Sequence, residues 1–109
     1  MKILICGEGG QGIQSIAQIL SKAAFLEGKF SLYIPNFGVE QRGGVSLAFL
    51  IIDDIEIFYP KFEKADLIAI LAKRSFPRVR SYLSDKTKVV FGPLVKPDQS
   101  LIKSDFYLV

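Results

Sequence analysis

The sequence predicts an α/β fold built on an open mixed sheet, with a parallel βαβ core and an antiparallel hairpin, flanked by helices. An apolar run at residues 3–6 passes through a glycine-rich turn into a stretch with helical apolar spacing, and a second apolar run follows. Further short apolar runs, separated by turn residues, recur to the end of the chain. The chain has 109 residues, so a single domain spanning residues 1–109 is expected.

Composition and charge narrow the class of protein. Half of the residues are hydrophobic and 23% are charged, which is typical of a globular chain. The net charge of +3 comes from dispersed basic residues. Their densest group, Lys73, Arg74, Arg78 and Arg80, is interpreted as the solvated face of a helix. No helix-turn-helix or aromatic–basic motif accompanies this group, so nucleic-acid binding is not expected.

Residues that usually carry acid–base, redox and metal chemistry are scarce. The chain contains no histidine, which excludes every histidine-based triad, acid–base pair or metal site on it. Its one cysteine, Cys6, cannot by itself hold a zinc ion or an iron–sulfur cluster, and a small core side chain is expected there. The longest apolar run, residues 45–52, is too short to span a membrane, and no signal peptide is visible. A cytoplasmic location is therefore expected.

Four glycines within six residues follow the first predicted strand and precede a helix. Gly7, Gly9 and Gly12 satisfy G-x-G-x-x-G, with Gly10 and Gln11 inside the turn. Without side chains, the backbone N–H groups of such a turn can approach a ligand, and the helix start adds its free N–H groups and its dipole. A turn of this kind is suited to a phosphate or pyrophosphate. Alternatively, the glycines only allow the strand and the helix to pack closely, and the motif alone leaves this choice open.

The first strand is predicted at residues 2–6 and the following helix at residues 11–27. Gly28 lies just past the helix, where a left-handed cap is needed. A second strand at residues 30–34 completes a βαβ unit, and its two strands are expected to pair in parallel. Apolar residues at three-and-four spacing form one stripe on the helix: Ile13, Ile16, Ala17, Leu20, Ala23 and Ala24.

A long polar loop, residues 35–44, follows the second strand and contains Glu40, Arg42 and Gly43. It falls at the carboxyl end of a strand, the edge where open α/β sheets bind ligands. Arg42 fits an anchor for a carboxylate, a phosphate or a partner's acidic group better than it fits a surface arginine. These three residues and the five residues of the glycine turn form the predicted ligand-binding site.

The rest of the chain alternates strands and a helix. Residues 45–52 and 55–58 are predicted to form an antiparallel hairpin around two aspartates. Further elements are expected at residues 65–71 (strand), 75–83 (helix), 88–91 (strand) and 106–109 (strand). The sequence stops inside an apolar run, so we expect either a partner that covers the last strand or a shortened form of the domain.

Three motifs, in order along the chain, resemble one family. They are Gly7-Glu8-Gly9-Gly10-Gln11-Gly12-Ile13 after a strand, Pro35-x-Phe37-Gly38-x-Glu40-x-Arg42-Gly43-Gly44 in a loop, and Ala65-Asp66-Leu67-Ile68 in a buried strand. The combination resembles the gamma subunit, or gamma domain, of the 2-oxoacid:ferredoxin oxidoreductases. That family includes the pyruvate, 2-oxoglutarate, 2-oxoisovalerate and indolepyruvate enzymes. Gamma domains of the family continue beyond this length, so the chain is expected to lack their C-terminal portion.

The resemblance implies an accessory gamma subunit of a complex that oxidatively decarboxylates a 2-oxoacid to an acyl-CoA and reduces ferredoxin. The implied partners are catalytic alpha and beta subunits and a ferredoxin-like delta subunit. Thiamine diphosphate and the iron–sulfur clusters are expected on those partners, because no thiamine-diphosphate signature is visible here. No catalytic residue, metal or cofactor is expected on this chain. Its role would be to support assembly, with coenzyme A as the candidate ligand of the glycine turn.

Two other interpretations belong to different classes of protein. One is a free-standing module that binds NAD or FAD, which predicts an acidic residue at the end of the second strand. The sequence has Ile34-Pro35-Asn36 there, which counts against this interpretation. The other is an interaction domain that forms a homo-oligomer through an exposed strand edge, in keeping with the high hydrophobic content.

Overall fold

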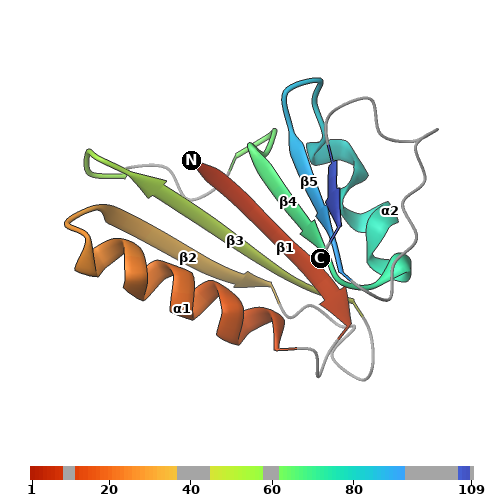
Figure 1. Ribbon diagram of the computed structural model, residues 1–109, viewed down its shortest axis with the longest axis horizontal. Helices are drawn as coiled ribbons and strands as arrows, with labels where there is room; N and C mark the ends of the chain where they lie inside the picture. Colours follow the sequence, from red (N-terminus) through yellow and green to blue (C-terminus); the bar gives the residue numbers. More distant parts are fainter. Residues whose placement is uncertain (9–11, 37–44, 58–61, 93–105, 109) are drawn as a thin grey trace.

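The computed structural model describes residues 1–8, 12–36, 45–57, 62–92 and 106–108. Within them, a six-stranded sheet has the strand order β2-β3-β1-β4-β5-β6 (Figure 1). The elements are, in chain order, β1 (Lys2–Glu8), α1 (Ile13–Leu26), β2 (Phe30–Asn36), β3 (Val45–Asp53), β4 (Leu67–Ile70), the 3-10 turn η1 (Lys73–Ser75), α2 (Phe76–Val79), the 3-10 turn η2 (Arg80–Tyr82), β5 (Lys88–Phe91) and β6 (Phe106–Leu108). The predicted open mixed α/β sheet with flanking helices is confirmed.

β1 lies inside the sheet and is buried on both faces. Its side chains alternate between two hydrophobic clusters, since Ile3 and Ile5 pack with α1 whereas Leu4 and Cys6 pack with the segment that contains α2. The two helical segments therefore cover opposite faces of the sheet. This arrangement explains why β1 is continuously apolar rather than alternating.

The predicted pairing of the first two strands is wrong, because β3 lies between them. β3 is antiparallel to both β1 and β2, so these two strands run in the same direction without being hydrogen-bonded neighbours. Residues 47–51 of β3 are buried, as an inner strand requires. β2 forms an edge of the sheet, and Pro35 is tolerated there because an edge strand can do without one N–H group.

The predicted hairpin of residues 45–52 and 55–58 is also wrong. β3 ends at Asp53, residues 54–57 form no strand, and Phe58 lies outside the described residues. The antiparallel partners of β3 come from earlier in the chain, and they are β1 and β2. The remaining strands β4, β5 and β6 continue the sheet in parallel from β1.

Glycines with positive φ lie at both ends of α1, Gly12 at 77° and Gly28 at 83°. The predicted left-handed residue after the helix is thus confirmed. The predicted apolar stripe is only partly buried, since Ile16 and Leu20 are 36% and 38% exposed. α1 is turned so that its polar Gln14 and Ser21 contact β2 and β3, which leaves one apolar flank of the helix in solvent.

The helix predicted at residues 75–83 is a series of three short turns, η1, α2 and η2. Val79 is fully buried and Phe76 is half-buried against the sheet. Tyr82 of η2 joins Phe49 of β3 and Phe62 in an edge-to-face aromatic cluster, with ring centroids 5.5 to 6.1 Å apart. Through this cluster, η2 packs against the face of the sheet opposite α1.

Candidate functional site

The strands that flank the glycine turn and the polar loop end at one edge of the sheet. Glu8, the last residue of β1, is in register with Val45, the first residue of β3, and Asn36 at the end of β2 is in register with Leu47 (Figure 1). The start of α1 also lies at this edge, which we call the glycine edge. Segments that are far apart in the sequence therefore meet where the motifs predicted a ligand site.

Two of the predicted site residues lie within the described chain. Gly7 belongs to β1 rather than to the turn, and it is buried in register with Ser46. Gly12 is exposed at the start of α1, and its φ of 77° disfavours any other residue. The other predicted site residues lie outside the described residues: Gly9, Gly10, Gln11, Glu40, Arg42 and Gly43.

A side-chain amide that the motifs did not single out fixes the start of α1. Gln14 Nε2 donates to the carbonyl of Leu47 at 2.8 Å and to Ser46 Oγ at 3.0 Å, and Gln14 Oε1 accepts a hydrogen bond from the Tyr33 hydroxyl at 2.5 Å. One side chain thus connects the first turn of α1 to β2 and to β3. Its role could not be predicted from the sequence, because its partners lie 19 to 33 residues away, beyond any local spacing.

A charge pair lies on the other side of the glycine edge. Arg74 Nε of η1 is 3.5 Å from Glu8 Oε1, and both side chains are about half exposed. The pair links the last residue of β1 to the turn that follows β4. An exposed pair of this kind contributes little to stability.

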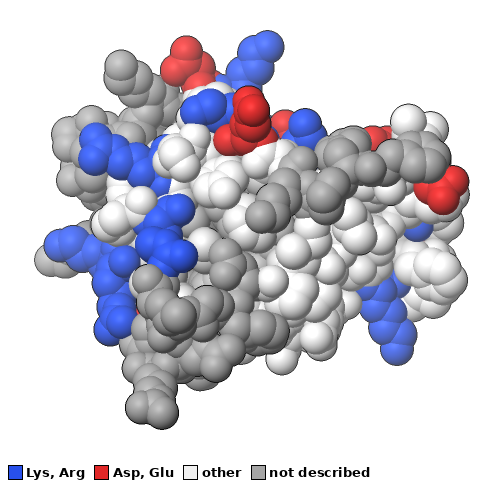
Figure 2. Space-filling view, turned by 180° about the vertical axis from the view of Figure 1, so that it is seen from behind, with Lys and Arg blue, Asp and Glu red and all other residues white. Residues whose placement is uncertain are grey.

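The basic group that follows β4 is exposed to solvent, as predicted. Lys73, Arg74, Arg78 and Arg80 are all exposed, and no Asp or Glu occurs between residues 67 and 84. Figure 2 shows lysine and arginine side chains gathered on the side of the molecule where α2 lies. This side of the protein is therefore a basic surface.

The thiol of Cys6 is buried in the core, as predicted. Burial raises the pKa of Cys6 from 9.0 to about 12, and a hydrogen bond from Ser75 opposes this increase. The Cys6 thiol also donates to the Ala69 carbonyl at 3.4 Å. Because the thiolate is the reactive form of cysteine, this side chain is inert in the folded protein.

We expect Cys6 to resist iodoacetamide at mildly alkaline pH in the folded protein and to react fully in concentrated guanidinium. The unfolded thiol ionises before the folded one, so stability should fall as the pH rises above about 9, by about 1.4 kcal/mol per pH unit for this one group. Denaturant titrations of wild type and Cys6→Ala over this range measure the effect as the difference in slope. Rapid labelling of the folded protein would contradict the assigned burial.

In the described part of the chain, no three residues among His, Cys, Asp and Glu come together as metal ligands would. Among the described helices, none has the length and apolar character needed to cross a membrane.

The class of domain is defined by a mixed α/β sheet whose strands β1, β2 and β3 have the ends that flank the two sequence motifs at one edge. Residues 2–105 match the family described as pyruvate ferredoxin/flavodoxin oxidoreductase, and the chain belongs to this family. It is 31% identical over 104 residues to the 2-oxoglutarate synthase subunit KorC of Archaeoglobus fulgidus, covering 95% of this chain and 52% of the relative. It is 43% identical over 72 residues to the pyruvate/ketoisovalerate oxidoreductases common subunit gamma of Thermococcus litoralis, covering 65% and 39% of the two chains.

The fold is shared with solved structures. The pyruvate oxidoreductase subunit PORC of Thermotoga maritima matches with a TM-score of 0.81 at 23% identity, over 100% of this chain and 61% of that one. The 2-oxoglutarate:ferredoxin oxidoreductase of Magnetococcus marinus matches with a TM-score of 0.84 at 18% identity, over 99% of this chain and 19% of that one. The chain spans about half the length of the KorC relative. The predicted family and fold are confirmed.

The alternative of an NAD- or FAD-binding module finds no support in the fold. A dinucleotide site of that kind needs a second parallel strand beside β1, with an acidic residue at its end for the ribose. Here the parallel neighbour of β1 is β4, which ends at Ile70 and is followed by residues 71–73, none of them acidic, and the other neighbour of β1 is the antiparallel β3.

Proposed function

We propose that this chain acts as an accessory gamma subunit of a 2-oxoacid:ferredoxin oxidoreductase and supports the assembly of its catalytic subunits. The observation that carries the proposal is the family match over residues 2–105. The complex would oxidatively decarboxylate a 2-oxoacid to an acyl-CoA and reduce ferredoxin. The cytoplasmic location and a single gamma-type domain over residues 1–109 stay predictions.

The reactive groups of the complex would lie on its other subunits. Thiamine diphosphate and iron–sulfur clusters are assigned to the alpha, beta and ferredoxin-like delta subunits. The chain's one cysteine is buried and inert, in keeping with a non-catalytic role. Support of assembly is then the main task of this chain.

We also propose the glycine edge as a site for the pyrophosphate of coenzyme A. The N–H groups of Gly9, Gly10, Gln11 and Gly12 would face the ligand, with Gly7 supporting the turn from within β1. Glu40, Arg42 and Gly43 would act from the polar loop. The support for this site is the left-handed Gly12 at the exposed start of α1, and the common edge at which the flanking strands end.

The proposed function is tested by co-expressing the tagged chain with the alpha, beta and delta subunits from the same organism. We expect a stoichiometric complex whose thiamine diphosphate and iron are retained by the partner subunits. Iron in the purified chain alone would mean that the roles of the subunits are assigned wrongly. If the chain elutes without the other subunits, the proposal is wrong.

Arg42→Ala should weaken assembly or coenzyme A binding by about 10- to 150-fold and leave the melting temperature unchanged. The expected size is that of a lost charge-assisted hydrogen bond, about 1.5–3 kcal/mol. Calorimetric titration with coenzyme A and recovery of the complex measure the two effects. Arg80→Ala, which removes an exposed arginine from the basic surface, is the matched control. If Arg42→Ala unfolds the protein, the arginine holds its own loop instead.

A further inference from the structure

The end of the molecule opposite the glycine edge carries a group of exposed apolar side chains. Phe25 and Leu26 in the last turn of α1 are each 73% exposed, and Phe30 at the start of β2 is 48% exposed. Met1 and Ile55 are 63% and 69% exposed. The ends of α1, β2 and β3 that carry or adjoin these residues lie together in Figure 1. Large apolar side chains gathered at one end of a molecule are typical of an interaction surface.

An open hollow of about 370 Å³ lies at this same end. Its lining includes Met1, Ala24, Glu27, Lys29 and Asp53. The hollow is thus lined by both aliphatic and charged side chains. It is large enough for one side chain of another protein.

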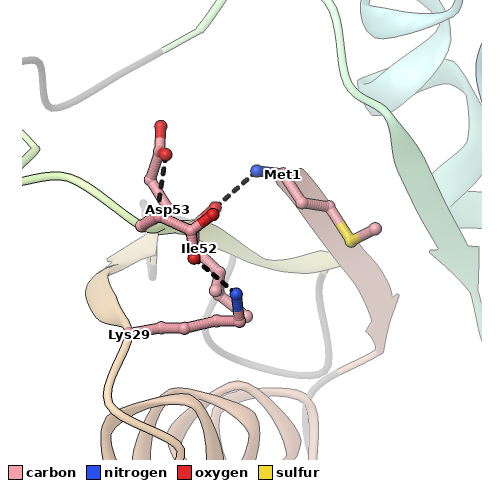
Figure 3. A network of polar contacts seen from close by, with 5 residues as sticks. Met1, Lys29, Ile52 and Asp53 are labelled. Carbon is pink, nitrogen blue, oxygen red and sulfur yellow. Dashed lines mark hydrogen bonds and ion pairs between the residues drawn. The ribbon is translucent and has the colours of Figure 1, made fainter.

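Hydrogen bonds hold the lining in place (Figure 3). The N-terminal amino group of Met1 donates to the Ile52 carbonyl, which ties β1 to the end of β3. Lys29 Nζ lies 2.5 Å from Asp54 Oδ1, and the Asp54 N–H donates to Asp53 Oδ1 at 2.7 Å. Both positive groups of the hollow are thus engaged within the chain, and the pair with Lys29 also engages the carboxylate of Asp54.

Acidic residues surround the exposed apolar group. Glu27 and Glu56 are exposed, whereas the exposed Asp54 is paired with Lys29, and residues 49–60 contain no Lys or Arg. We define the distal surface as Met1, Phe25, Phe30 and Ile55 together with the exposed carboxylates of Glu27 and Glu56.

We propose that the distal surface docks another subunit of the complex, which inserts an apolar side chain flanked by lysine or arginine. This inference rests on the proposed function. The exposed carboxylates of the distal surface favour a basic partner. They disfavour a second copy related by a two-fold axis, because the carboxylates of the two chains would face one another. The exposed aromatic and aliphatic groups supply the apolar centre that protein interfaces require.

The test uses the full chain and the co-expressed alpha, beta and delta subunits, with affinity measured by biolayer interferometry at about 0.15 M salt. Ile55→Ser and Phe25→Ser should each weaken binding at least tenfold, as expected for apolar anchors at the centre of an interface. Ile19→Ser is the matched control, because Ile19 is 68% exposed in the middle of α1 and lies outside the distal surface. It should change the affinity less than twofold.

A charge reversal tests the carboxylates of the distal surface separately. Glu56→Lys should weaken binding and reduce its dependence on salt, whereas Asp85→Lys, an equal change at an exposed site between η2 and β5, should do neither. Circular dichroism melting checks that each variant is folded.

The outcomes separate the two proposals. If the wild-type chain binds and Ile55→Ser and Phe25→Ser bind equally well, the distal surface is not the interface, and the gamma-subunit role stands. If the wild-type chain does not bind the subunits, both proposals fall. If the chain alone increases in mass with concentration and Ile55→Ser abolishes that increase, the occupant is a second copy and the inference is wrong.

Discussion

Phe49→Ala is expected to lower the free energy of unfolding by about 3–5 kcal/mol. Phe49 lies on β3, is 5% exposed, and has its ring centroid 5.6 Å from that of Phe62 and 5.5 Å from that of Tyr82. Truncation removes the centre of this aromatic cluster and leaves a cavity that neighbouring strands cannot fill. Each lost edge-to-face pair adds about 0.5–1.5 kcal/mol to the loss of buried area.

Denaturant titration followed by circular dichroism measures this effect. The matched control is Phe25→Ala, which makes the same chemical change at a side chain that is 73% exposed, and it should stay within about 0.5 kcal/mol of wild type. Equal losses for the two variants would mean that Phe49 is not part of the core.

Gln14→Ala should cost about 2 kcal/mol of stability, the second largest effect expected here. The variant leaves the Tyr33 hydroxyl, the Ser46 hydroxyl and the Leu47 carbonyl without the amide that joins them. These groups are partly buried, so water replaces the lost hydrogen bonds only in part. We also expect faster amide hydrogen exchange in the first turn of α1, because that turn loses its attachment to β2 and β3.

Gln18→Ala is the control for this prediction, since Gln18 is exposed on the same helix. It should leave both stability and exchange within error of wild type. A Gln14→Ala variant that behaves like Gln18→Ala would mean that apolar packing alone places α1.

Local patterns in the sequence were sufficient for most elements and for the class of fold. The helix could be predicted because its apolar spacing is regular and Gly28 marks its end. β5 could be predicted because residues 88–91 form a short apolar run between turn residues, and the structure has the strand at these same residues. These signals depend only on residues that are close together in the sequence, so they predict an element whatever its neighbours in the fold.

Pairing between strands could not be predicted in the same way. Residues 30–36 fit a parallel neighbour of β1 as well as an edge strand beside β3, and only the position of β3 decides between them. Pro35 within this strand was a usable signal, because proline favours an edge. The contacts of Gln14 and the Glu8–Arg74 pair join residues 19 to 66 apart in sequence, so no local spacing predicts them.

The position of β3 between β1 and β2 also constrains the order of folding. During synthesis, β1, α1 and β2 leave the ribosome before β3, the strand that pairs with both β1 and β2, has been made. A nascent chain that ends before residue 45 has no hydrogen-bonded partner for either β1 or β2. The sheet can therefore form only after β3 has been synthesised, and its folding nucleus needs contacts between residues far apart in sequence. Such contacts slow folding. Until they form, the apolar side chains of β1 are exposed on the nascent chain.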